Sequence, residues 1–70
     1  MNLWTAEEEK EYVIKSIEAD DSELEGFLFT LGCYAGEPIT VVYRLKGSCV
    51  VAIKDGRYTI DKELAKSIKV

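Results

Sequence analysis

The side chains that could carry reactive chemistry are two cysteines, Cys33 and Cys49, separated by fifteen residues in a chain that contains no histidine. Two thiols could hold a metal ion or form a redox pair, but such metal sites usually combine Cys and His ligands at close spacing, such as C-x-x-C. Cys49 alternates instead with Val51 and Ile53, as on the apolar face of a strand. A free cysteine behaves as a small hydrophobic residue. We therefore predict that both thiols are free and lie in the core.

Carboxylates form the second candidate group, and five of them fall in the run "EADDSELE" at residues 18–25. Carboxylate oxygens suit hard divalent cations, but this run lacks the spaced ligands and the glycine of a calcium loop. We interpret it as a solvated acidic turn. It could at most bind a divalent ion such as Fe2+ or Mn2+ weakly, so we predict no cofactor and no defined metal site.

No combination of residues in this chain indicates catalysis. A general base or nucleophile needs an oriented partner and a cleft that excludes water. No serine or cysteine here has an evident base, and "GCYAG" at residues 32–36 matches neither of the phosphate-binding glycine patterns. We therefore predict that the protein is not an enzyme.

Thirteen acidic and nine basic residues give the chain a net charge of -4. This balance argues against nucleic acid as a partner, because a basic surface supplies most of that affinity, and against docking on anionic membranes. No apolar run is long enough to insert into a bilayer, and the acidic start "MNLWTAEEEKEY" is not typical of a signal peptide. We expect a cytoplasmic protein that folds as one domain over residues 1–70, with residues 1–10 as an N-terminal lead-in.

One helix is predicted over residues 22–31. Ser22 and Glu25 match a capping box at its start, and Gly32 stands where a left-handed residue ends a helix. Gly26 weakens the helix, which suggests that it allows close packing. Four apolar residues share one helical stripe that we expect to be mainly core: Leu24, Phe27, Leu28 and Leu31.

The remaining pattern predicts five short strands, at residues 11–19, 37–45, 49–54, 57–60 and 67–70. In the second of them, Ile39, Val41, Tyr43 and Leu45 are predicted to share one face. Asp55 and Gly56 indicate a hairpin in which both central positions of a type I′ turn have positive φ. Asp61 is predicted to cap a short helical turn before the last strand. Five short strands in so small a chain favour a partly open barrel.

Three segments together resemble the FeoA domain: "EYVIKSIE", "LFTLGCYAGEPITVVYRL" and "GSCVVAIKDGRYTIDKELAKSIKV". The pattern LG-x-x-x-G-x-x-[IV]-x-V is their most specific part, and it begins at Leu31 and Gly32. The chain departs from the family's pattern where Glu9 or Lys10 replaces a glycine and where Cys33 and Cys49 replace aliphatic residues. The resemblance implies a mainly β fold, a small SH3-like five-stranded partly open barrel with one short α-helix and a C-terminal helical turn.

The same resemblance implies a cytosolic adaptor of ferrous-iron uptake that modulates a membrane transporter of the FeoB type by contacting its cytoplasmic GTPase region. Aromatic residues near the helix are candidate anchors for such contact. The predicted partner-binding residues are Leu24, Phe27, Leu28, Phe29, Leu31, Tyr34 and Tyr43. Two alternatives remain: a sensor that binds a divalent transition metal through carboxylates, and an SH3-like peptide-binding module unrelated to iron. A homodimer is also open, with "SIKV" as the candidate edge strand.

Overall fold

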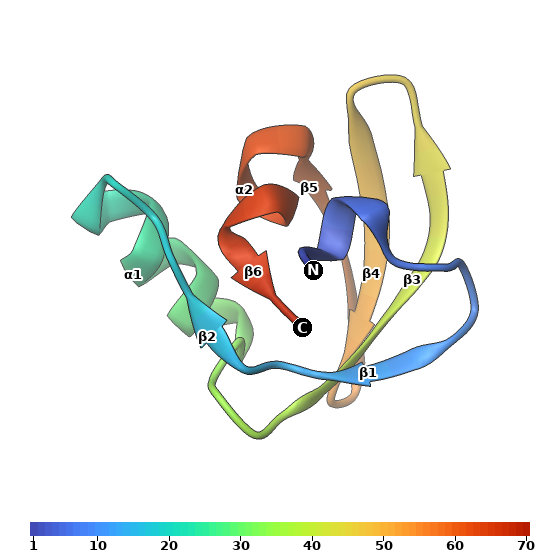
Figure 1. Cartoon of the computed structure of the whole chain (residues 1–70), viewed down its shortest axis with the longest axis horizontal. Helices are drawn as coiled ribbons and strands as arrows, with labels where there is room; N and C mark the ends of the chain where they lie inside the picture. The colour runs from blue at the N-terminus through green and yellow to red at the C-terminus, as the bar shows by residue number, and fades with distance from the viewer.

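The computed structural model describes residues 1–70 and contains six strands, two α-helices and one 3-10 helix (Figure 1). The predicted elements are all present, and the first predicted strand is divided into two. In chain order the elements are η1 (Leu3–Thr5), β1 (Glu11–Val13), β2 (Ser16–Ile17), α1 (Ser22–Leu31), β3 (Pro38–Leu45), β4 (Ser48–Ile53), β5 (Gly56–Asp61), α2 (Lys62–Ser67) and β6 (Ile68–Lys69).

The strands form two antiparallel sheets. The larger sheet has the order β1-β3-β4-β5, and the smaller pairs β2 with β6. The chain changes sheets between β1 and β2. The amide of Ile14 donates to the carbonyl of Glu37, which precedes β3 of the larger sheet, whereas the amide of Lys15 donates to the carbonyl of Lys69 in β6 of the smaller sheet. The result is the SH3-like, mainly β fold predicted from the sequence, built from two sheets that do not close into a single barrel.

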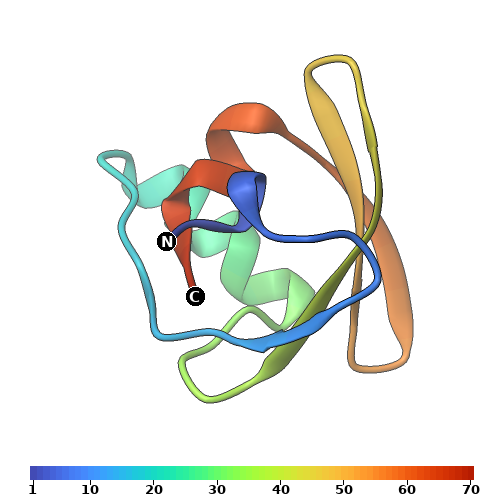
Figure 2. The same ribbon diagram turned by 45° about the vertical axis from the view of Figure 1, so that its right-hand side comes forward.

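The core lies between the concave side of the larger sheet, η1 and the C-terminal segment, as two views of the ribbon show (Figures 1 and 2). Residues 1–10, which we described as a lead-in, contribute to it: Leu3 and Ala6 are buried. The short helix η1 packs against α2. The N-terminal segment therefore closes one side of the core.

A β-bulge in β3 reverses which residues face the core. Val41 pairs with Val51, but the next pairing joins Tyr43 to Val50, so Val42 is left over. Because side chains alternate across a strand, one extra residue turns everything beyond it to the other face. The prediction that Tyr43 shares a face with Val41 is therefore wrong: Val41 is buried, whereas Tyr43 is 48% exposed.

Arg44 takes the inward position that the bulge creates. It pairs across the sheet with Cys49, which is buried. Its guanidinium donates to the carbonyl oxygens of Trp4, at 2.8 Å, and Ala6. Its backbone amide donates to a carboxylate oxygen of Glu8 at 2.7 Å. The bulge thus turns the side chain of Arg44 inward, where it hydrogen-bonds to the N-terminal segment and holds that segment against the sheet.

The predicted hairpin after β4 is confirmed, but its turn is shifted by one residue. Ile53 pairs with Gly56, so the central positions are Lys54 and Asp55. Only Lys54 of these two has a positive φ, at 52°. The assignment of a type I′ turn to Asp55 and Gly56 is therefore wrong.

The C-terminal segment is not a free edge strand. β6 pairs with β2 through Ile68 and Ile17, while Lys69 forms a bridge with Asn2. The amide of Val70 donates to Met1 O at 2.9 Å. The segment "SIKV", proposed from sequence as a dimerisation edge, is thus occupied by pairing within the chain.

Candidate partner-binding surface

Helix α1 begins and ends at residues whose backbone and side chains complete its hydrogen bonds. Asp21 is the N-cap, and its carboxylate accepts from the amide of Glu23 at 2.8 Å. The predicted capping box at Ser22 is therefore wrong by one residue, because Asp21 supplies the oxygen. Gly32 ends the helix in the left-handed region, at φ 96°, as predicted. Its amide donates to the carbonyls of Leu28 and Phe29.

Most of the apolar side chains on α1 are not part of the core. Leu28 is fully buried, but Leu24 is 36% and Phe27 46% exposed. The expectation that this stripe is mainly core is wrong for these two residues, because α1 makes only sparse contacts with the other elements. A methyl group on Gly26 would meet no atom within 4 Å. The prediction that Gly26 permits close packing is therefore also wrong.

The helix lies at the side of the molecule, with its first turn farthest from the larger sheet and its last turn closest to it (Figure 1). Leu24 and Phe27 are three residues apart, and Leu31, which is half-buried, follows four residues later. Residues with this spacing are neighbours on one face of a helix. Leu24, Phe27 and Leu31 thus form a stripe, here called the α1 stripe, whose N-terminal part is open to solvent.

A groove of about 530 Å³ lies beside the C-terminal end of α1. The rings of Phe29 and Tyr34 stack at one side of it, with centroids 5.4 Å apart and planes 4° from parallel. Across the groove, Tyr58 lies over Gly56. The residues that line the groove are Phe29, Thr30, Leu31, Gly32, Tyr34, Lys54, Asp55, Gly56 and Tyr58.

Lys54 connects the β4–β5 turn to the end of α1. Its Nζ lies 5.9 Å from the centroid of the Tyr34 ring and 3.7 Å from a carboxylate oxygen of Glu37. Its aliphatic carbons run past Gly32, where a Cβ would be 3.2 Å away. Since α1 has no basic residue in its last turn, Lys54 supplies the positive charge that stabilises a helix C-terminus. No local sequence signal places Lys54 at the end of α1, because it belongs to the turn between β4 and β5.

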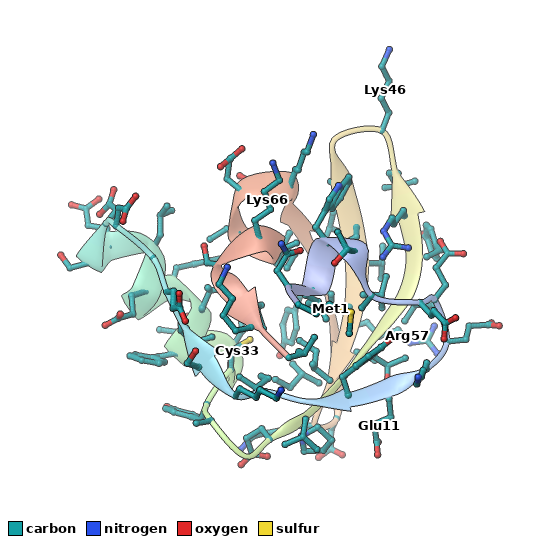
Figure 3. All side chains as sticks on the ribbon, in the orientation of Figure 1. Met1, Glu11, Cys33, Lys46, Arg57 and Lys66 are labelled. Atoms are coloured by element: carbon teal, nitrogen blue, oxygen red, sulfur yellow. The ribbon has the colours of Figure 1, made fainter.

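An acidic hollow of about 200 Å³ lies at the other end of α1, between the β2–α1 connection and α2. Its lining residues are Glu18, Ala19, Asp20, Asp21, Leu24, Glu63, Lys66 and Ser67. Figure 3 shows acidic side chains fanning out around the first turn of α1. No group of three or more Cys, Asp or Glu side chains in the structure converges as metal ligands would.

Both cysteines are free and buried, which confirms the prediction that they are core residues. Burial raises the pKa of the Cys33 thiol from 9.0 to about 11. Burial also raises the pKa of the Cys49 thiol, and the positive charge of Arg44 opposes this shift. Both groups are therefore protonated at neutral pH, and a protonated thiol is a poor nucleophile and metal ligand.

The structure divides the seven predicted partner-binding residues into four settings. Leu24 and Phe27 are exposed on α1, Phe29 and Tyr34 line the groove with Leu31, Leu28 lies in the core, and Tyr43 lies on the outer face of the larger sheet. Two residues that sequence reasoning missed, Lys54 and Tyr58, join the groove from the β4–β5 hairpin.

Comparison with known proteins gives one family match. A sequence model of the FeoA domain matches residues 1–70. No curated protein sequence matches the chain significantly. None of the helices is long and apolar enough to cross a membrane.

Several solved structures share the fold. A manganese-dependent transcriptional repressor superposes with a TM-score of 0.89 at 18% identity, over 97% of this chain and 39% of the repressor. A crystal structure of an iron uptake regulatory protein, FeoA, superposes with a TM-score of 0.85 at 17% identity, over 97% of this chain and 91% of that chain. A manganese-dependent transcriptional repressor in complex with manganese superposes with a TM-score of 0.87 at 20% identity, over 97% of this chain and 34% of the repressor.

Proposed function

The chain belongs to the FeoA domain family, and from this premise we propose that it is a cytoplasmic adaptor of ferrous-iron uptake. FeoA domains are non-enzymatic accessory domains. In this proposal the protein contacts the cytoplasmic GTPase region of a FeoB-type transporter and modulates iron uptake through that contact. We further propose that residues 1–70 act as one domain, because Leu3, Leu28 and Val70 all belong to one core cluster.

The observation that carries the proposal is the exposure of apolar side chains on α1. Leu24 and Phe27 stand on a helix that the rest of the fold hardly covers. Large apolar side chains that cluster on one exposed face are typical of protein–protein contacts. Leu28, next to Leu24 on the same helical stripe, is fully buried and holds the helix to the core, so in this proposal it supports the surface without touching the partner.

The groove at the other end of α1 extends this surface. Phe29 and Tyr34 present a stacked aromatic pair, and Tyr58 of β5 lines the same groove. Aromatic side chains are enriched at interfaces because they bury large areas at low entropic cost. We propose that the partner spans both the α1 stripe and this groove, so that Leu24, Phe27, Phe29, Leu31 and Tyr34 contact it.

The experiment is an amide NMR titration of the labelled protein with the soluble GTPase region of a FeoB-type transporter from the same source. We expect shifts that cluster at residues 22–34 and 54–58. Phe27→Ala should weaken binding at least about tenfold, the size of a typical interface anchor. Tyr43→Ala is the matched control, because Tyr43 is equally exposed, at 48% against 46%, but lies on the outer face of the larger sheet. Equal effects of the two substitutions, or no shifts at all, would refute this assignment.

A further inference from the structure

The N-terminal half of α1 combines an exposed apolar surface with unneutralised negative charge. Five carboxylates and no basic residue lie within residues 18–25. Three of these carboxylates, those of Glu18, Asp20 and Asp21, line the acidic hollow, and Leu24 contributes an apolar wall to it. The apolar anchor and the charged rim are therefore parts of one continuous surface.

The carboxylates of this surface have no cation of the chain at ion-pair distance. The two ion pairs of the structure join Lys10 to Glu7 and Lys54 to Glu37, both away from the hollow. Lys66 lines the hollow but forms neither pair. Part of the hydrogen-bonding capacity is used internally: Asp21 caps α1, and Glu18 accepts from the hydroxyl of Ser16 at 3.1 Å. The remaining charge repels anionic surfaces and attracts cationic ones.

From this juxtaposition we propose that the first half of α1 docks a cationic amphipathic segment of the partner protein. Apolar side chains of that segment would cover Leu24 and Phe27, and its lysine or arginine side chains would pair with Asp20, Glu23 and neighbouring carboxylates. Charge complementarity of this kind sets orientation and association rate, while the apolar anchors supply affinity. The inference rests on the proposed function only in naming the transporter's GTPase region as the source of such a segment.

The surface can be probed without the transporter. A synthetic amphipathic helix of leucine and lysine is titrated into the labelled full chain, and a peptide of the same pattern with glutamate in place of lysine serves as the charge control. We expect the lysine peptide to shift the amides of residues 18–27 and the glutamate peptide to shift none. Affinity should fall at least about fivefold between roughly 50 and 500 mM salt, because exposed charge pairs are screened at high ionic strength.

Two pairs of variants separate specific docking from general attraction to an acidic protein. Asp20→Asn combined with Glu23→Gln should weaken binding about fivefold or more, whereas Glu7→Gln with Glu11→Gln makes the same change in net charge at the other acidic cluster and should have little effect. Phe27→Ser should weaken binding, and Tyr43→Ser should not. Equal effects of the paired variants, or equal binding of the two peptides, would overturn the inference.

A competition experiment keeps this inference distinct from the proposed function. If the GTPase region binds and the lysine peptide displaces it, the adaptor function and the docking of a cationic segment on α1 both stand. If the GTPase region binds through another face and the peptide does not displace it, the inference fails and the adaptor function survives. If the peptide binds as expected and the GTPase region does not bind, the docking surface stands and its assignment to the transporter fails.

Discussion

The two α-helices of this small protein are used in opposite ways. Helix α2 has six residues, of which Leu64, Ala65 and Ser67 are buried, and it packs against η1, β4 and β5. Helix α1 has ten residues, of which only Leu28 is fully buried, and its contacts with other elements are sparse. The longer helix therefore contributes less to the core than the shorter one.

This difference explains why the apolar content of α1 exceeds what the fold needs. A helix that served only to cover the core would bury its whole apolar stripe. Here Leu28 anchors the helix, while Leu24 and Phe27 remain outside. We infer that α2 is retained for stability and α1 largely for recognition. The following predictions test this division, beginning with the largest expected effect.

Substituting the buried and the exposed leucine of α1 should give very different losses of stability. Leu28→Ala removes a fully buried side chain and should lower the free energy of unfolding by about 2–5 kcal/mol. Leu24→Ala, at 36% exposure, should cost under about 1 kcal/mol. Urea denaturation followed by Trp4 fluorescence or circular dichroism measures both. Similar losses for the two variants would mean that α1 is packed along its whole stripe and would remove the basis for the comparison.

Cys33, which follows the C-terminal end of α1, tests how well this end of the helix excludes water from the core. Because the folded-state pKa of Cys33 is raised to about 11, the folded state favours the protonated thiol. Its contribution to stability is therefore fully present below pH 9 and is lost as the pH rises toward 11. The loss at pH 11 should be on the order of 2 kcal/mol, from about 1.4 kcal/mol for each pKa unit.

Lysine and tyrosine residues titrate in the same range, so the measurement is a difference between two proteins. Urea denaturation of the parent and of Cys33→Ala is compared at pH 8 and pH 11. The parent should lose about 2 kcal/mol more than the variant over this interval. Equal losses would show that water reaches Cys33 and that the end of α1 opens readily.

The two N-caps allow the helices to be compared by one kind of substitution. Asp61 accepts from the amide of Leu64 at 2.8 Å and caps α2 as predicted, while Asp21 accepts from that of Glu23 at the same distance. Asp61→Ala should lower global stability by about 1 kcal/mol. Asp21→Ala should leave the urea midpoint almost unchanged but accelerate hydrogen exchange in the first turn of α1, because a weakly packed helix frays locally. Asp20→Ala removes the same charge but no N-cap residue, so it should change neither the urea midpoint nor the hydrogen exchange of α1.

The sequence predicted the fold well wherever a local signal controls the structure. Gly32 ends α1 and Asp61 begins α2 for reasons that lie within a few residues of each. The burial of Cys49 in the core could be predicted from its alternation with Val51 and Ile53 along one strand. These features depend on local backbone conformation and on strand periodicity, both of which can be derived from the sequence alone.

The features that escaped sequence analysis depend on contacts between distant segments. The bulge at Val42 leaves Tyr43 outside and brings Arg44 to the carbonyls of Trp4 and Ala6, forty residues away in one case. No periodicity within β3 encodes that reversal. The exposure of Phe27 is similar, because helical spacing identifies a stripe but does not say how much of it the rest of the chain covers. The sequence could therefore nominate candidate residues on α1, but it could not tell that Leu28 is buried or that Lys54 and Tyr58 join the groove.

The smallest expected effect has the opposite sign. Glycine inside a helix is less favourable than alanine by about 0.5–1 kcal/mol, and no atom lies within 4 Å of the position that a Cβ would take at Gly26. Gly26→Ala should therefore raise the free energy of unfolding slightly and slow hydrogen exchange in α1. At about 100° per residue, position 26 points away from the face that carries Leu24, so partner binding should not change. A loss of stability would show that α1 packs more closely than in this structure, whereas a gain in stability with a loss of binding would show that the partner extends around the helix to Gly26.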